Sequence, residues 1–277
     1  MRGPTLHPDD GSSSGDPDDG STFAHGEFEV EALVAAKAGR SVSVCIPARN
    51  EEATVGAIVH AIVSTLTGVA GGVPLVDEVV VVDDGSTDRT AEVARGAGAR
   101  VVRSESRSGG KGQAMRSAIN ATDGDLIAFV DADVTNFTPH FVTGLLRPLL
   151  ADEAVTLVKG FYERPLQGAL DGGGRVTELM ARPVIDLLFP HLAVIEQPLA
   201  GETAAPRWVL EKCGLADGYA VELALLIDVA SLYGVDSIAQ VDLGIRIHRN
   251  RPLDELRPQA TDVLRAALAR ARPVTPD

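Results

Sequence analysis

The 277-residue sequence has only two cysteines, Cys45 and Cys213, and neither lies close in sequence to another cysteine or a histidine. We predict Cys45 inside a strand and Cys213 in a helix end or turn. Two such residues fit buried thiols in a reducing cytoplasm better than a disulfide framework. The sequence also lacks a run of about eighteen apolar residues and a basic leader followed by an apolar stretch. We therefore expect a soluble protein with neither a membrane span nor a secretory signal.

Positive charge is scarce, because 25 Lys and Arg residues face 39 Asp and Glu residues, for a formal net charge of −14. Nucleic acid is bound through clustered Lys and Arg, so the composition argues against it as a general partner. Part of the acidic excess lies in residues 1–27, among Gly, Ser and Pro. This segment cannot bury enough apolar surface to order itself, and we predict a disordered acidic tail.

Asp131-Ala132-Asp133 directly follows the apolar run of residues 126–130. Such a run is typical of a buried strand in a parallel sheet, and ligands of open α/β sheets bind at the carboxyl ends of these strands. Carboxylate oxygens there suit a hard divalent cation that carries a substrate diphosphate. A solvated turn or a helix cap is the alternative for an isolated Asp-x-Asp.

A second strand with an acidic end lies upstream, where the valines of residues 79–82 run into Asp83 and Asp84. Strands are also predicted at residues 42–46 and 100–103. Helices are predicted between them, after residue 52 and over residues 87–97, and a further helix follows Gly110-Lys111-Gly112 as far as residue 119. This alternation predicts a right-handed, doubly wound parallel sheet, with a nucleotide site above the strand ends.

The motifs at these strand ends resemble the nucleotide-sugar half of GT-A glycosyltransferases. They are residues 46–52 (IPARNEE), residues 82–88 (VDDGSTD), Gly110-Lys111-Gly112 and Asp131-Ala132-Asp133. Motifs of the second half are similar to glucosyl-3-phosphoglycerate synthases and their mannosyl-3-phosphoglycerate relatives. They are residues 157–162 (LVKGFY), 173–179 (GGRVTEL), 197–202 (QPLAGE), 218–222 (GYAVE) and 248–253 (HRNRPL). The likeness covers about residues 30–256.

The resemblance implies a GT-A, Rossmann-like α/β sheet that binds the nucleotide sugar over residues 28–150. A smaller α/β part over residues 151–277 would bind the acceptor and end in a C-terminal helix, which we expect at residues 258–268. The stretch over residues 165–172 and the loop before Lys111 are shorter than in the relatives, which leaves the shape of the pocket open.

The donor-binding residues follow from the resemblance. They are Pro47, Ala48, Arg49, Asn50, Glu51, Asp84, Lys111, Asp131, Ala132, Asp133, Tyr219 and Glu222. The first five would line the base and ribose, and Glu51 can accept hydrogen bonds from ribose hydroxyls. Asp84 would contact the pyrimidine edge through an exposed side chain, with a turn cap as the alternative. Lys111 would meet a phosphate as a point charge between two glycines, unless the motif is only a flexible surface turn.

The implied metal ligands are Asp133 and His248, and the cofactor would be Mg²⁺ or Mn²⁺. Such an ion would stabilise the charge that grows on the leaving diphosphate as the sugar bond breaks. A lone histidine is more often a surface group or a hydrogen-bonded core group, and here only the adjoining motif favours metal binding. Asp131 would contact the ribose or a water bound to the metal.

The implied acceptor-binding residues are Gly174, Arg175, Thr177 and Asn250. A phosphoglycerate carries a phosphate and a carboxylate, which a guanidinium can bind through two hydrogen bonds. The glycines before Arg175 offer free N–H groups, and Thr177 adds a hydroxyl where a helix begins. A mobile loop that orders only when substrate binds is also compatible with these glycines.

The implied catalytic residues are Glu222, Asp133 and Lys111. The relatives retain the anomeric configuration, which requires either double displacement or attack from the same face. Glu222 is a possible nucleophile for the first route, although an acid at the start of a helix is also simply favourable to its dipole. We favour the second route, in which the leaving diphosphate takes the proton of the acceptor.

The predicted function is metal-dependent transfer of glucose from UDP-glucose to the 2-hydroxyl of 3-phosphoglycerate by a cytoplasmic enzyme. The alternatives are GDP-mannose as the donor, a catalytically idle sugar-nucleotide-binding protein, and a transferase that acts on polyprenyl phosphate. The last would usually carry a hydrophobic or basic amphipathic segment, which we do not find. The resemblance also implies a homodimer, with part of residues 179–192 or the C-terminal region in the interface. The apolar surface of residues 179–192 exceeds what one helix stripe needs, which would mark a contact, and a helix buried all round in its own subunit is the alternative.

Overall fold

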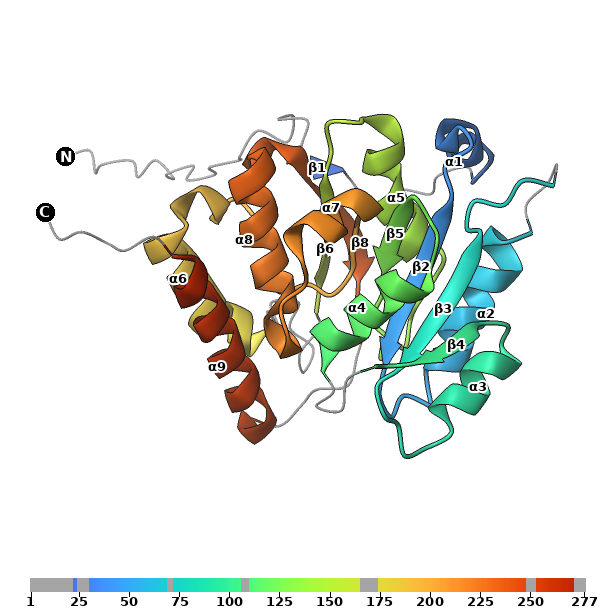
Figure 1. Cartoon of the computed structure of the whole chain (residues 1–277), viewed down its shortest axis with the longest axis horizontal. Coiled ribbons are helices and arrows are strands. Elements are labelled where there is room, and N and C mark those ends of the chain that lie inside the picture. The colour runs from blue at the N-terminus through green and yellow to red at the C-terminus, as the bar shows by residue number, and fades with distance from the viewer. Residues whose placement is uncertain are drawn as a thin grey trace, which may run out of the picture.

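The computed structural model describes residues 22–23, 30–68, 72–105, 110–164, 174–247 and 253–271. Within these ranges, eight strands form one sheet in the order β1-β8-β6-β7-β5-β2-β3-β4 (Figure 1). The strands are β1 (Thr22–Phe23), β2 (Val42–Ala48), β3 (Glu78–Asp83), β4 (Arg100–Arg103), β5 (Leu126–Phe129), β6 (Leu157–Glu163), β7 (Thr203–Pro206) and β8 (Ile238–Ile245).

Helices cover both faces of the sheet. The α-helices are α1 (Val30–Lys37), α2 (Val55–Leu66), α3 (Thr90–Gly96), α4 (Lys111–Ala121), α5 (His140–Ala151), α6 (Arg182–Leu188), α7 (Arg207–Cys213), α8 (Val221–Tyr233) and α9 (Leu253–Arg270). A π-helical turn, η1 (Thr177–Ala181), leads into α6, and 3-10 turns form η2 (Pro190–Leu192), η3 (Gly218–Ala220) and η4 (Val235–Ser237). None of the described helices is long and apolar enough to cross a membrane.

The first half of the sheet confirms the predicted parallel arrangement, since β5, β2, β3 and β4 are neighbours and parallel. Ala48 pairs with Asp83, so β2 and β3 end at the same level. The sequence analysis missed β7, which runs antiparallel between β5 and β6. Its four residues, TAAP, are too short and too poor in large apolar side chains to give a strand signal.

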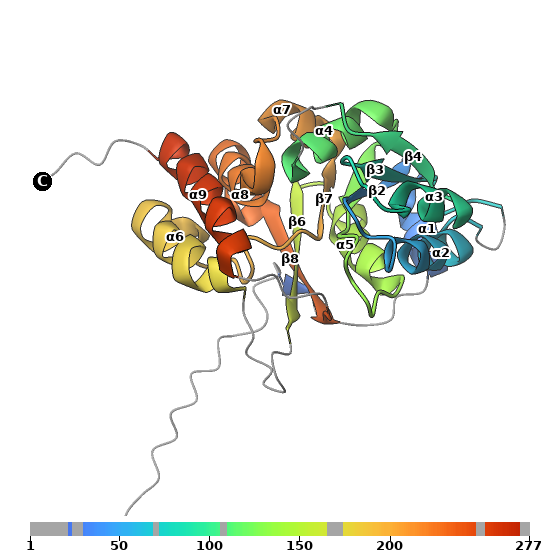
Figure 2. The same ribbon diagram turned by 90° about the horizontal axis from the view of Figure 1, so that it is seen from below.

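Successive residues of each strand point to opposite faces, which produces two cores. Val44 and Ile46 pack with α1, α2, α3 and α5, whereas Cys45 packs on the other face with α4 and α6 to α9 (Figure 2). The core around Val44 also contains Val241 from the second half of the chain. The predicted donor-binding and acceptor-binding parts therefore build one continuous sheet, and their division of labour stays a prediction.

Two predicted boundaries are wrong. Helix α3 begins at Thr90 rather than at residue 87, because Asp88 accepts a hydrogen bond from the Thr90 N–H (3.0 Å) and holds the preceding residues in a turn. The predicted disordered tail over residues 1–27 contains β1, which pairs with Gln240 and Val241 of β8. An edge strand offers unpaired backbone groups, so two residues can pair there without an apolar segment of their own. The other residues of the tail lie outside the described ranges.

Strand β8 contains a β-bulge. Phe161 pairs with Asp242 and Glu163 with Ile245, so β8 uses one residue more than β6 over this stretch. Gly244 takes a φ of 74°, in the left-handed region that glycine tolerates, and its N–H donates to Asp242 Oδ1 at 2.8 Å. Such a bulge bends the strand and redirects the residues that follow it, of which Arg246 is the second.

Candidate active site

The ends of β2 and β3 are tied together by the residues predicted to hold the base and ribose. Asn50 has a φ of 57°, and its Oδ1 accepts a hydrogen bond from the Thr87 N–H at 2.8 Å. The Glu51 N–H donates to Thr90 Oγ1 at 2.8 Å. Arg49 and Asn50 are exposed, Pro47 and Glu51 are half-buried, and Ala48 is buried. These two hydrogen bonds join the segments that follow β2 and β3, and the contacts of these residues with base and ribose stay a prediction.

Asp84 is buried, and the expectation that it needs an exposed side chain is wrong. Its Oδ2 accepts a hydrogen bond from the Gly110 N–H at 2.6 Å. Its Oδ1 is also shielded from solvent, yet no hydrogen-bond donor reaches it from the described part of the chain. The carboxylate therefore links β3 to the start of α4 and keeps one acceptor oxygen for another partner.

Lys111 brings together three separate motifs. It is the first residue of α4, and its Nζ lies 2.5 Å from Asp131 Oδ1 and 2.8 Å from Glu222 Oε1. Burial opposes the charge on Lys111, but the two carboxylates outweigh it and raise the pKa of the ammonium. Burial likewise opposes the charge on Asp131, and Lys111 together with Arg246 holds the pKa of that carboxyl well below its usual range. Lys111 and Asp131 are therefore both ionised at neutral pH.

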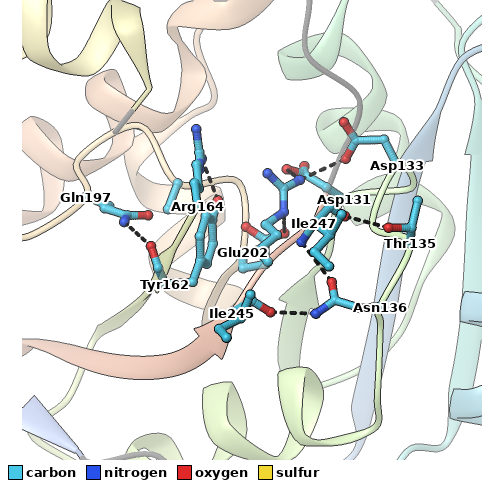
Figure 3. Close-up of polar contacts among 12 residues, drawn as sticks. Asp131, Asp133, Thr135, Asn136, Tyr162, Arg164, Gln197, Glu202, Ile245 and Ile247 are labelled. Atoms are coloured by element: carbon cyan, nitrogen blue, oxygen red, sulfur yellow. Dashed lines mark hydrogen bonds and ion pairs between the residues drawn. The ribbon is translucent and has the colours of Figure 1, made fainter. Parts of the chain in front are cut away.

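Arg246, which the sequence analysis missed, joins the same cluster from the end of β8. Its Nη2 lies 2.7 Å from Asp131 Oδ2 and 2.8 Å from Asp133 Oδ1, and its side chain is only 3% exposed. Its Nε lies 3.1 Å from Glu202 Oε1, an ion pair without hydrogen-bond geometry. Figure 3 shows the carboxylates of Asp131, Asp133 and Glu202 gathered at this point. The sequence signal that could have pointed to Arg246 was its position as a charged residue at the end of a strand with alternating apolar residues.

Two further buried charges were missed. Glu202 is fully buried, and burial raises the pKa of its carboxyl. Lys159 in β6 is also buried, its Nζ donates to the Ala200 carbonyl at 2.6 Å, and burial lowers its pKa to about 8. Gly201 lies between Ala200 and Glu202 in the sequence, and a Cβ added to it would overlap the Lys111 ammonium and the Asp131 carboxylate. The segment that contains Ala200, Gly201 and Glu202 therefore packs directly against the Lys111–Asp131 pair.

A divalent cation fits Asp133. Its carboxylate is partly exposed at a strand end and uses Oδ1 for Arg246, and carboxylate oxygen is the donor that Mg²⁺ and Mn²⁺ prefer. The described residues contain no group of three or more His, Cys, Asp or Glu side chains that could complete a metal site on their own. The predicted second ligand, His248, lies outside the described residues.

The predicted acceptor residues lie at the start of η1. Arg175 is exposed, Thr177 is buried, and the Glu178 N–H donates to the Gly174 carbonyl at 3.0 Å. Asn250 lies outside the described residues. On the donor side, Tyr219 lies partly exposed in η3, beside the start of α4. The structure thus brings Lys111, Asp131 and Glu222 into contact, and Arg246 links Asp131 with Asp133.

The order of the sheet and its acidic strand ends define a GT-A glycosyltransferase fold. The family model described as "Glycosyl transferase family 2" matches residues 43–176. Glucosyl-3-phosphoglycerate synthase of Mycolicibacterium smegmatis is 50% identical over 88% of this chain and 82% of its own length. The enzyme of that name from Mycobacterium tuberculosis H37Rv is 47% identical over 86% of this chain and 76% of its own.

Solved structures agree with these relatives. The crystal structure of glucosyl-3-phosphoglycerate synthase from Mycobacterium tuberculosis in complex with Mn²⁺, UDP-glucose and phosphoglyceric acid has a TM-score of 0.82 and 45% identity, covering 90% of this chain and 86% of that one. The chain belongs to the glucosyl-3-phosphoglycerate synthase family.

Proposed function

We propose that this chain transfers glucose from UDP-glucose to the 2-hydroxyl of 3-phosphoglycerate, with retention of configuration and with Mg²⁺ or Mn²⁺ as cofactor. The observation that carries the proposal is the contact of Lys111 with both Asp131 and Glu222, because three motifs that are far apart in the sequence meet at one ammonium group. The relatives support the choice of substrates. The Mycobacterium tuberculosis enzyme has been crystallised with UDP-glucose and phosphoglyceric acid, with UDP and glucosyl-3-phosphoglycerate, and with Mg²⁺ and UDP.

On the donor side, the joined ends of β2 and β3 would hold the nucleoside, with Asp84 Oδ1 as an acceptor for a base N–H. Lys111 would face the diphosphate from the start of α4, where backbone N–H groups also favour an anion. Asp133 and His248 would hold the metal, which when bound supplies positive charge to the leaving diphosphate. Asp131, Ala132, Tyr219 and Glu222 would surround the ribose and the sugar.

The state of Glu222 bears on the route of transfer. Its carboxylate is buried and paired with Lys111 at 2.8 Å, which stabilises the anion and weakens it as a nucleophile. A covalent intermediate on Glu222 would require that pair to break. The pairing therefore supports attack from the same face, with Glu222 orienting the sugar and the leaving diphosphate accepting the proton of the acceptor hydroxyl.

A matrix of donors and acceptors tests the function. UDP-glucose and GDP-mannose are each incubated with 3-phosphoglycerate, glycerate or a polyprenyl phosphate, with Mg²⁺ or with EDTA, and the released nucleotide and the glycosylated product are measured. We expect product from UDP-glucose and 3-phosphoglycerate, lost in EDTA. Product only from GDP-mannose, only on the polyprenyl phosphate, or from no combination would overturn the assignment.

We further propose a cytoplasmic homodimer that pairs through η1 and α6. Leu179 and Leu187 on these elements are 78% and 80% exposed, which is more apolar exposure than a single helix stripe needs. Light scattering of the purified chain at micromolar concentration tests the dimer. The Leu187→Glu variant is expected to be monomeric, and a wild-type mass equal to one chain would overturn the proposal.

A further inference from the structure

Arg164 follows β6 directly and was not among the residues predicted for either substrate. Its side chain is held on Tyr162, because Arg164 Nη2 donates to the Tyr162 hydroxyl at 2.7 Å and its Cζ lies 4.9 Å from the centre of the ring. Figure 3 shows the two side chains side by side. A guanidinium fixed in this way loses little further freedom when it binds a ligand.

The free end of this guanidinium faces the predicted acceptor site. A Cβ added to Gly174 would lie 2.9 Å from Arg164 Nη1 and 3.1 Å from Thr177 Oγ1. A nitrogen of Arg164 and the hydroxyl of Thr177 therefore both approach the same backbone position, at which the segment containing Arg175 begins. Glycine at position 174 keeps the space between these two groups open.

The Nε of Arg164 is buried, and no hydrogen-bond acceptor among the described residues reaches it. A buried N–H without a partner is costly, and an N–H on a cation most of all. Part of the Arg164 guanidinium is thus buried without an acceptor from the described part of the chain, and it lies beside a turn that offers the Thr177 hydroxyl. An anionic ligand with planar or tetrahedral oxygens would satisfy it.

Tyr162 connects this guanidinium with the charge cluster of the donor site. Arg246 Cζ lies 5.1 Å from the centre of the same ring, and Arg246 contacts Asp131 and Asp133. A group bound by Arg164 would therefore lie beside the donor site, where an acceptor must be placed.

We propose that Arg164 binds an anionic group of the acceptor, either its carboxylate or its phosphate, together with Arg175 and Thr177. This inference rests on the proposed function, because it takes an acceptor with two anionic groups as given. Tyr162 acts as a positioning residue, since its ring and hydroxyl fix the direction of the guanidinium.

The test is a comparison of Arg164→Gln and Arg164→Lys with the wild type, using separate titrations of UDP-glucose and 3-phosphoglycerate. Loss of a charge-assisted hydrogen bond is expected to raise the KM for the acceptor by about ten- to a hundredfold. The KM for the donor should change less than about twofold. Arg164→Lys should recover part of the acceptor affinity, because lysine keeps the positive charge but not the planar guanidinium that can donate two hydrogen bonds to one anion. Tyr162→Phe should give a smaller change in the same direction.

A matched control is Arg40→Gln. The Arg40 guanidinium donates to the Leu149 and Lys37 carbonyls before the start of β2, at the opposite end of the strands from the site. This variant is expected to match the wild type in both titrations. Thermal unfolding of every variant checks that the fold is kept, and Arg164→Lys serves if Arg164→Gln does not fold.

Binding of glycerate and of glycerol 3-phosphate as competitive inhibitors identifies the group that Arg164 holds. If Arg164 binds the phosphate, Arg164→Gln weakens glycerol 3-phosphate and spares glycerate, and the reverse holds for the carboxylate. An acceptor KM unchanged by Arg164→Gln, or a donor KM raised equally, would overturn the inference. Failure of the wild type to glycosylate 3-phosphoglycerate would instead overturn the proposed function, so the two failures are distinct.

Discussion

Replacing Arg246 by methionine should be among the most destabilising single changes in the charge cluster. Methionine keeps the length of the aliphatic chain, so the perturbation is the loss of the guanidinium. Arg246 contacts Asp131, Asp133 and Glu202, and the last of these is fully buried. The substitution leaves three carboxylates facing one another with the cation removed from between them.

The size of the effect follows from this geometry. Removing one partner of a buried ion pair costs about 3 to 5 kcal/mol, because an uncompensated charge stays buried. Asp131 and Asp133 are 20% and 23% exposed, so water screens part of the repulsion and the lower figure applies. In a chain of this size, about 3 kcal/mol lowers the melting temperature by roughly 6 to 12 °C.

The assay is thermal unfolding in EDTA and again with Mg²⁺. Arg270→Met is the matched control, because Arg270 lies 2.7 Å from Asp228 with both side chains about a quarter exposed, and this pair contains no fully buried group such as Glu202. Added Mg²⁺ should stabilise Arg246→Met more than the wild type, since a bound cation can replace the lost charge. If Arg246→Met melts no lower than Arg270→Met, the view of Arg246 as the counter-ion of the cluster is wrong.

Three further predictions concern neighbouring groups. Gly201→Ala should lower kcat by about a hundredfold or more, because its Cβ would overlap the Lys111–Asp131 pair. The control is Gly68→Ala, where an added Cβ meets open space, and this variant should be as active as the wild type. Equal kcat values for the two variants would refute the reasoning. Asp133→Ala should lower turnover at saturating UDP-glucose by about a hundredfold or more, and near-wild-type turnover without added metal would contradict its role as a ligand. The pKa of Lys159 is about 8 in the folded protein, against an ordinary 10.5. Between pH 8 and pH 10.5 the folded protein therefore binds fewer protons at this residue than the unfolded chain does. As a result, Lys159 makes the free energy of unfolding rise with pH over this range, by up to about 3 kcal/mol. Urea unfolding between pH 8 and pH 10 should show a smaller rise for Lys159→Met, and an unchanged slope would refute the assignment.

The sequence predicted those parts of the fold whose signals are local. The valines before Asp83 and the apolar run before Asp131 each predicted a strand and its acidic end, because a buried parallel strand has no polar positions to blur the pattern. Motif resemblance then placed Lys111 and Glu222 in one site, and the structure brings them within contact of each other.

The missed residues depend on long-range contacts. Arg246 meets Asp131 across more than a hundred residues of sequence, and nothing near Arg246 in the chain indicates a carboxylate partner. Lys159 donates a hydrogen bond to a backbone carbonyl, and such a partner cannot be recognised from the sequence because every residue has one. Arg164 approaches the predicted acceptor site only through the fold, which places Gly174 beside its guanidinium. Burial and tertiary contacts, rather than residue type, decide such roles.

The extra residue in β8 has a consequence for how this enzyme can vary. Side chains alternate between the two faces of a strand, so the count of residues between Val241 and Arg246 decides which face the guanidinium reaches. Deleting Gly244 would remove the bulge, direct Arg246 to the opposite face and bring an isoleucine toward Asp131 and Asp133. A deletion of one residue, usually harmless where a strand runs into a surface loop, would here exchange the counter-ion of the active site for a hydrocarbon. Relatives are therefore expected to differ in length before β8 or after it, and to keep this short stretch at constant length.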